Sequence, residues 1–206
     1  CLWLQQKGWP KFDGRAFRDS ANTVETERAQ ARRLVARLAG EELELLARLS
    51  VLGSTFRREH ALALAEKLER LPGAPFRFDS LLGPWIEPGD ARGYHRLSPL
   101  LDDRTVAPAR RVELETACAQ VRLENVPVYM HDAALALRHA LNAANALLAA
   151  QIAARFLLTL KRERGEAYWH LLWLTSFSAE ELERMFSGHP IFESFIHLLR
   201  FQIAAE

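Results

Sequence analysis

The residues that could act as nucleophiles do not stand in the patterns that activate them. Ser50, Ser98 and Ser176 lack the G-x-S-x-G turn that presents a catalytic serine above a hydrolase sheet. Cys118 lies between two alanines in a helical pattern, where a cysteine behaves as a small buried apolar residue. We therefore expect no catalytic activity within this chain.

The histidines, cysteines and acidic residues show no metal-binding pattern. None of the seven histidines belongs to an HExxH motif or lies at ligand spacing from a cysteine or carboxylate. His131 next to Asp132 is typical of a helix start, and we expect His139 near a helix-to-helix turn with a structural role. Cys1 and Cys118 form no CxxC pair. The sequence predicts no metal, no disulfide framework and no cofactor within this chain.

Aromatic residues near the C-terminal end have two interpretations. Tyr168, Trp169, Trp173 and Phe177 could line a ligand pocket, or they could form the core between helices, which we favour because aromatic side chains dominate packing. Trp169 and Trp173 become candidates for binding a partner if both are exposed on one face. Ser178 and Glu181 have the spacing of a helix capping box, so the nearby carboxylates are better explained as first-turn charges.

Composition and charge exclude several classes of protein. Hydrophobic residues make up 49% of the chain and charged residues 26%, a balance that favours a folded globular protein over a disordered one. The net charge of +1 is too small for a protein whose main role is to neutralise phosphates. The most apolar stretch, residues 143–160, is interrupted by Asn145, Gln151 and Arg155, which predicts a buried helix and no membrane span.

The start of the chain suggests where the protein works. It begins at Cys1 and shows no basic segment followed by an apolar stretch and a cleavage site. We therefore expect a fragment of a longer protein. The two distant cysteines, which predict no disulfide framework, favour the cytoplasm, and we expect no membrane partner.

The first half of the sequence predicts three compact helices followed by a hairpin. Apolar residues at three- and four-residue spacing predict two helices over residues 25–52, with a hinge near Gly40. A further helix is expected over residues 57–68 and a short one over 76–82. Residues 85–87 and 94–98 flank a glycine-rich turn and predict a β-hairpin. This order is typical of a winged helix.

The second half is predicted to be helical to its end. From about residue 107, the pattern of residues 131–160 indicates two antiparallel helices joined around 142–145, with alanines at the crossing. This pair resembles one unit of a tetratricopeptide-like solenoid. The expected fold is mainly α, with residues 1–40 as the end of a preceding domain, 41–106 as a winged helix and 107–206 as helical hairpins.

The motifs at the two ends of the predicted winged helix resemble those of one family. Residues 46–53 read LARLSVLG and residues 94–101 read YHRLSPLL. Together they look like the winged-helix region of STAND signal-transducing ATPases, in which an L-x-R-L-S-V-F-like helix opens the domain and a Y-R-L-H-P-L-like strand closes it. The resemblance covers residues 25–103 and implies a regulatory region that couples a nucleotide switch to a helical sensor.

The resemblance has specific consequences for nucleotides. No P-loop pattern, GxxxxGK[ST], is present, so ATP or ADP would be bound by an ATPase domain preceding Cys1. The family's histidine before the proline, which senses bound diphosphate, is replaced by Ser98. His95 is an odd number of residues away and would point to the other face of a strand. Either Ser98 senses nucleotide through its hydroxyl, or sensing at this position is absent.

Two other functions remain open from the sequence. A winged helix could bind DNA, with Arg77 in the third helix and Arg92 and Arg96 in the wing as contacts, although nearby acidic residues offset them. Alternatively, the chain could be a helical scaffold that binds proteins without any switch.

Overall fold

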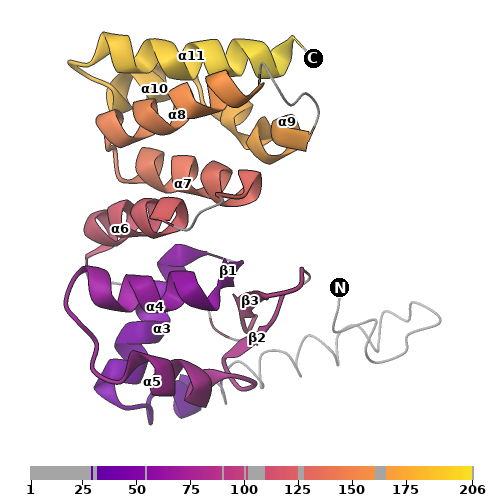
Figure 1. The fold of residues 1–206 in the computed structure, drawn as a ribbon. Helices are drawn as coiled ribbons and strands as arrows, with labels where there is room; N and C mark the ends of the chain where they lie inside the picture. Colours follow the sequence, from indigo (N-terminus) through magenta and orange to yellow (C-terminus); the bar gives the residue numbers. More distant parts are fainter. Residues whose placement is uncertain are drawn as a thin grey trace, which may run out of the picture.

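The structure, a computed structural model, is mainly helical and carries one small antiparallel sheet (Figure 1). It describes residues 29, 32–53, 55–89, 91–99, 101, 110–124, 128–160 and 166–205. Of the segment predicted to end a preceding domain, residues 1–40, only residues 29 and 32–40 belong to this part. Within the described ranges, no helix has both the length and the apolar character needed to cross a bilayer.

Residues 40–98, called here the first module, contain three helices and three short strands. The elements are α3 (Gly40–Leu52), β1 (Phe56–Arg57), α4 (Arg58–Lys67), α5 (Ala74–Leu81), β2 (Ile86–Pro88) and β3 (Tyr94–Leu97). The hinge at Gly40, the following helix and the hairpin are confirmed. The short third helix begins two residues earlier than predicted, at Ala74, because Pro75 suits the first turn, where its missing N–H is not needed.

The strands pair in the order β1-β3-β2, so β3 lies in the middle of the sheet. Phe56 of β1 pairs with His95 of β3, and Ile86 of β2 pairs with Leu97. β1 was not expected from the sequence because a strand of two residues has no measurable alternation. It matters for the site, since it places Arg57 beside Tyr94 in the register.

The core of the first module lies between the helices and one face of the sheet. Leu45, Leu49, Phe56 and Phe78 are fully buried. Arg48 is equally buried, although it is charged; its Nη1 donates to the carbonyls of Leu64 and Ala65 at the end of α4. A buried cation that satisfies the free carbonyls of a helix end costs much less than an unpaired one.

The described residues of 128–205, called here the second module, are mainly helical and pack against α6 (Arg111–Glu124). Its elements are α7 (Met130–Asn142), α8 (Ala146–Leu160), α9 (Glu166–Leu171), the 3-10 helix η1 (Leu172–Ser176), α10 (Ala179–Met185) and α11 (Pro190–Ala204). Successive helices lie in layers, with α7 between α6 and α8, and α11 against α8 (Figure 1). The predicted helix pair of residues 131–160 is confirmed, with its turn at Ala143–Asn145.

Helix α6 joins the two modules, because one of its faces packs in the core of the first module and another packs in the core of the second. Leu114, Cys118 and Val121 are buried with the first module, in contact with α3 and α4. Ala119 and Leu123 pack with α7 and the rest of the second module. Cys118 is fully buried, as predicted, and its burial raises the pKa of the thiol. The first and second cores therefore share one helix.

Candidate functional site

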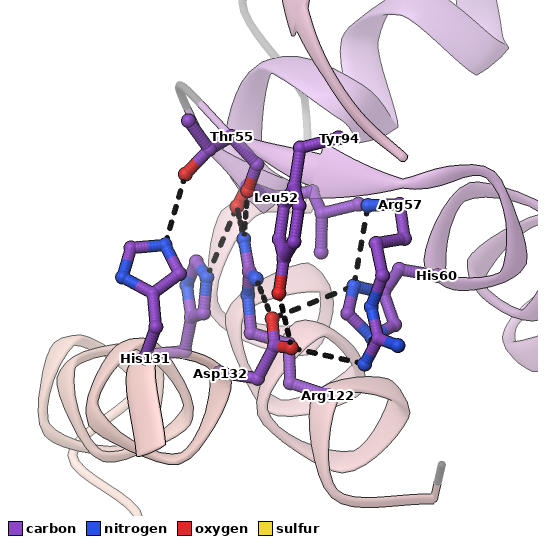
Figure 2. A network of polar contacts seen from close by, with 9 residues as sticks. Leu52, Thr55, Arg57, His60, Tyr94, Arg122, His131 and Asp132 are labelled. Atoms are coloured by element: carbon purple, nitrogen blue, oxygen red, sulfur yellow. Dashed lines mark hydrogen bonds and ion pairs between the residues drawn. The ribbon is translucent and has the colours of Figure 1, made fainter. Parts of the chain in front are cut away.

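Asp132 is the centre of a polar network at the junction of the modules (Figure 2). It lies in the first turn of α7 and has no exposed surface. Its Oδ1 accepts a bond from Arg122 of α6 at 2.9 Å. Its Oδ2 accepts bonds from Arg57 of β1 and from the hydroxyl of Tyr94 of β3, both at 3.0 Å. One carboxylate thus holds together four elements from across the chain.

Arg122 extends the network to the end of α3. Its guanidinium is fully buried, and its Nη2 donates to the carbonyls of Leu52 at 2.6 Å and Thr55 at 2.7 Å. The last carbonyls of a helix have no partner within the helix and carry partial negative charge, so a cation is favourable there. Burial lowers the pKa of Arg122, and Asp132 opposes that shift.

His139 contacts the same helix end through a second buried pair. Its Nε2 lies 3.3 Å from the carbonyl oxygen of Leu52, and its Nδ1 lies 2.7 Å from a carboxylate oxygen of Glu115. Burial lowers the pKa of His139. The residue lies within α7 and not in the turn that the sequence suggested, because α7 continues to Asn142. Its structural role agrees with the expectation.

Burial also fixes the protonation of two other members of the network. His60 of α4 lies 3.7 Å from Asp132, and burial lowers its pKa to about 4 despite the attraction of that carboxylate. Burial and the charge of Asp132 raise the pKa of Tyr94 to about 12. At neutral pH His60 is therefore uncharged and Tyr94 keeps its proton, which it donates to Asp132.

Two guanidinium groups of the network share one carboxylate. Arg57 and Arg122 both pair with Asp132, and neither pairs with a second carboxylate among the described residues. The Nε atoms of both arginines are buried and have no hydrogen-bond partner among the residues that the structure describes. The guanidinium of Arg57 lies over the rings of Tyr94, at 5.7 Å, and Tyr129, at 4.9 Å, where cation–π attraction stabilises it.

A cavity of about 440 Å³ opens beside this network, between the two modules. The first module contributes Thr55, Ala91 and Tyr94, and the second contributes Tyr129, Met130, His131 and His170. The Nε2 atom of His131 lies 3.2 Å from the hydroxyl of Thr55 across the junction, as Figure 2 shows. The His131 ring stands edge-on to Tyr94 at 6.0 Å and to His170 at 5.3 Å. Aromatic and imidazole rings therefore form most of its wall.

The residues that the resemblance and the DNA hypothesis singled out lie elsewhere. Ser98 follows β3 and is 3% exposed, with its N–H donating to the carbonyl of Trp85. Arg77 donates to the carbonyl of Pro72 and lies 3.6 Å from Glu41, and Arg96 pairs with Glu87 at 3.2 Å. Arg92 is exposed in the turn between β2 and β3.

The two tryptophans do not form one exposed surface. Trp169 of α9 is 77% exposed, which corrects the expectation that it belongs to a core. Trp173 is half-buried, packs edge-on against Phe177 at 6.0 Å and lies under the guanidinium of Arg138. The core interpretation therefore holds for Trp173 and is wrong for Trp169, whose short helix presents it away from the buried side of Leu171.

Sequence reasoning did not single out Asp132, Arg122, Arg57 or Tyr94 as functional. The one local signal is in α6, where Arg122 takes a position next to Val121 on a face otherwise occupied by Leu114 and Cys118. A charged residue at a core position indicates a buried partner, but nothing in the sequence says which.

Comparisons of the chain with protein-family models, with curated proteins and with solved structures find no match.

Proposed function

We propose that the chain is a non-catalytic regulatory and interaction unit in which a winged helix, the first module, is coupled to a helical sensor, the second module. The observation that carries this proposal is the buried Asp132, which bonds to α6, β1 and β3 from the start of α7. Any movement of the second module against the first must break those bonds. A protein that switches between two conformations needs a set of contacts that is made in one of them and broken in the other, so that a bound partner can shift the equilibrium.

The winged-helix part of the proposal is supported by topology. The order helix, strand, two helices and a hairpin, with the central strand last in sequence, is the arrangement expected of that fold. The α7–α8 pair, followed by α11 against α8, supports a helical-hairpin array of solenoid type. The STAND resemblance adds a preceding ATPase domain as the first module's partner in the same chain and ATP or ADP as the ligand of that domain.

Ser98 needs a separate argument within this proposal. With 3% of its surface exposed, it offers its hydroxyl to no nucleotide in the conformation described. If Ser98 contacts a nucleotide, the end of β3 must first be uncovered. The simpler form of the proposal therefore has the switch act through the junction and leaves Ser98 with a structural role.

The DNA-binding alternative is weakened by ion pairing. Arg77 on α5 and Arg96 on β3 are engaged with Glu41 and Glu87, and Arg58 beside α5 pairs with Asp79 at 3.1 Å. A DNA contact at these residues would first have to displace a carboxylate, which reduces the gain from counterion release. A scaffold without a switch is the remaining alternative.

The test uses the complete reading frame that contains this chain. We expect a P-loop upstream of residue 1 and stoichiometric ADP in the purified protein, measured by chromatography after denaturation. A matched variant with the P-loop lysine changed to alanine serves as the control and should retain none. A reading frame without a P-loop, or protein without nucleotide, would overturn the ATPase part; DNA binding in 0.15 M salt would then favour the alternative.

A further inference from the structure

The cavity between the modules has the size and the position of a small-molecule site. Its volume of about 440 Å³ lies within the range of roughly 300–1,000 Å³ that is usual for ligand pockets. Residues from both modules line it, so an occupant would contact both at once. None of the described residues in its wall is an aspartate, a glutamate, a lysine or an arginine. Its contacts to a ligand therefore come from rings, hydroxyl groups and apolar side chains.

The charged side chains behind this wall balance one another. Arg57 and Arg122 supply two guanidinium groups to the junction. Asp132 and Glu115 supply two carboxyl groups to it. Arg111 also reaches Glu115, at 3.5 Å, but its side chain is 68% exposed to solvent. Neither an anion nor a cation in the cavity would gain a countercharge from the described wall, and burying an unpaired charge is costly. The surroundings therefore favour an uncharged ligand.

The imidazole of His131, which lines the cavity, is neutral as well. Burial lowers its pKa, the charges of His170 and Arg122 act in the same direction, and the charge of Asp132 opposes them. Because the net effect is a lowered pKa, His131 carries no charge at pH 7.5. A neutral imidazole has one N–H donor and one acceptor nitrogen. A ligand that meets His131 therefore finds a polar group without a charge.

The rings in the wall favour a flat ligand. The ring of His131 stands edge-on to Tyr94 at 6.0 Å and to His170 at 5.3 Å. Tyr129 adds a fourth ring, with 54% of its surface exposed. A planar aromatic ligand can stack on one of these rings and meet the edge of another, whereas a saturated ring makes no such contacts. Met130, at the start of α7, is an adaptable apolar contact.

The polar groups in the wall can both donate and accept hydrogen bonds. Nε2 of His131 lies 3.2 Å from the hydroxyl of Thr55, and the second ring nitrogen of His131 has no hydrogen-bond partner among the described residues. The imidazole of His170 is exposed and makes no hydrogen bond to another described residue. A hydroxyl or a neutral imidazole can take either role. This set suits a ligand whose edge carries a donor beside an acceptor, as a carboxamide does.

From these observations, we propose that the cavity binds an uncharged planar aromatic compound that carries a hydrogen-bond donor and an acceptor on its edge, such as an aromatic carboxamide. Its ring would lie among Tyr94, Tyr129 and His131, and its polar edge would reach the imidazoles of His131 and His170. Such a ligand would bridge the modules and hold them in the conformation described. The proposal rests on the junction itself and not on the ATPase function, because binding to the cavity and retention of ADP are separate measurements.

The first test compares three compounds of nearly equal size and shape that differ in charge, by calorimetry and ligand-observed NMR at pH 7.5. Benzamide is uncharged and should bind with a Kd of about 0.1–1 mM. Benzoate is an anion and benzamidine a cation, so each should bind about tenfold more weakly or worse. Binding of either ion as tightly as benzamide, or no binding of benzamide, would overturn the proposal.

Two further uncharged compounds test the flat ring and the polar edge. Cyclohexanecarboxamide has the amide without the flat ring, and methyl benzoate has the ring and an acceptor without a donor. Each should bind about threefold to tenfold more weakly than benzamide, the first for lack of ring contacts and the second for lack of a hydrogen bond. Cyclohexanecarboxamide binding as tightly as benzamide would overturn the assignment of an aromatic ligand. Equal binding of methyl benzoate would overturn the assignment of a donor to its edge.

The last test locates the ligand. Ala91→Trp places a large side chain at the cavity from an exposed position outside the buried network, so benzamide affinity should fall about tenfold or more. Ala179→Trp, at an exposed position at the start of α10, is the matched control and should leave affinity unchanged. Should Ala91→Trp fail to fold by circular dichroism, His170→Ala replaces it, with His197→Ala at another exposed position as its control. Unchanged affinity in the folded cavity variant would place the ligand elsewhere and overturn the assignment.

Discussion

Asp132 has no exposed surface, and each hydrogen bond it accepts comes from a donor held by a different element. A buried carboxylate is tolerated only when its partners compensate for the lost hydration. Here the partners need compensation as well, since Arg122 is equally buried. The pair is therefore weak evidence for high stability and strong evidence that removing either partner would be costly.

Replacing Asp132 by asparagine should destabilise the fold strongly. Asn keeps the shape but leaves Arg122 and Arg57 without a countercharge, and breaking a buried pair in this way costs about 3–5 kcal/mol. The free energy of unfolding can be measured in urea by circular dichroism. Asp79→Asn is the matched control, because the Arg58–Asp79 pair is 42% and 54% exposed and should contribute less than about 1 kcal/mol. Similar losses in both variants would contradict the prediction.

The stability of the protein should fall in mild acid because of His60. Its pKa is about 4 in the folded chain and 6.5 when unfolded, so the unfolded state binds more protons between those values. The contribution of neutral His60 to the free energy of unfolding is fully present above pH 6.5. It is lost as the pH falls toward 4, at about 1.4 kcal/mol per pH unit. The charged groups that act on His60 are Asp132 and Glu59, which oppose the lowering of its pKa, and Arg122 and Arg57, which add to it.

Urea unfolding between pH 4.5 and 7.5 tests this. His60→Asn keeps an acceptor for the N–H of Arg57 and should flatten the pH dependence by about one proton. His131 and His139, whose pKa values are also lowered by burial, remain in this variant and keep part of the slope. His197→Asn, at an exposed position, serves as the control for replacing a histidine by asparagine. An unaltered slope in His60→Asn would show that His60 titrates normally in the folded protein.

At the scale of elements, the end of α3 decides how the first module meets α6. Gly53 follows Leu52 with φ 105° and ψ −170°, a region that essentially only glycine adopts, and this turn exposes the Leu52 carbonyl to Arg122. Gly53→Ala should therefore cost about 1–3 kcal/mol. Gly40→Ala is the matched control, since neither glycine has an atom within 4 Å of an added Cβ and only Gly53 has positive φ.

Thermal unfolding followed by circular dichroism compares the two variants. Gly40 is the first residue of α3, where alanine should leave stability unchanged or raise it by up to about 1 kcal/mol. A loss in Gly40→Ala as large as in Gly53→Ala would show that the lost flexibility of glycine, and not the backbone angle at the end of α3, controls the effect.

The elements were largely predictable from the sequence because their signals are local. The apolar stripe of residues 131–160 and the glycine-rich turn between residues 88 and 93 indicate a helix pair and a hairpin without knowledge of the rest of the chain. β1 was missed because two residues carry no periodicity. The strand exists only by pairing with β3, in which Tyr94, the partner of Arg57, lies 37 residues further along the chain. The exposure of Trp169 could not be predicted either, because it depends on how α9 packs against the other helices.

The junction could not be predicted for a physical reason. Asp132 bonds to residues from β1, β3 and α6, and the separation from Arg57 is 75 residues. In the sequence, charged side chains of this kind are indistinguishable from surface residues. Asp132 follows His131 at a predicted helix start, where an acidic residue is already explained by its favourable interaction with the helix dipole. Only the packing of α6 against both modules converts them into a buried network.

At the scale of the molecule, α6 makes the two modules one structural unit. Its residues enter both cores, Lys67 of α4 pairs with Glu124 at its end, and Arg122 bonds across to Asp132. Opening the junction would expose apolar surface and break buried ion pairs together, so neither module should open alone. This arrangement predicts cooperative unfolding of the described part of the chain.

Native-state hydrogen exchange followed by mass spectrometry tests that cooperativity. Peptides from the buried parts of α3 and α7 should exchange with the same opening free energy in the unaltered protein, because both need global unfolding. In Asp132→Asn the two values should separate by about 1 kcal/mol or more, since the first module then opens without the second. Asp79→Asn should lower both values equally or leave them unchanged. Different opening free energies for α3 and α7 in the unaltered protein would mean that the junction is open often enough for each module to unfold independently, and the coupling proposed for Asp132 would be lost with it.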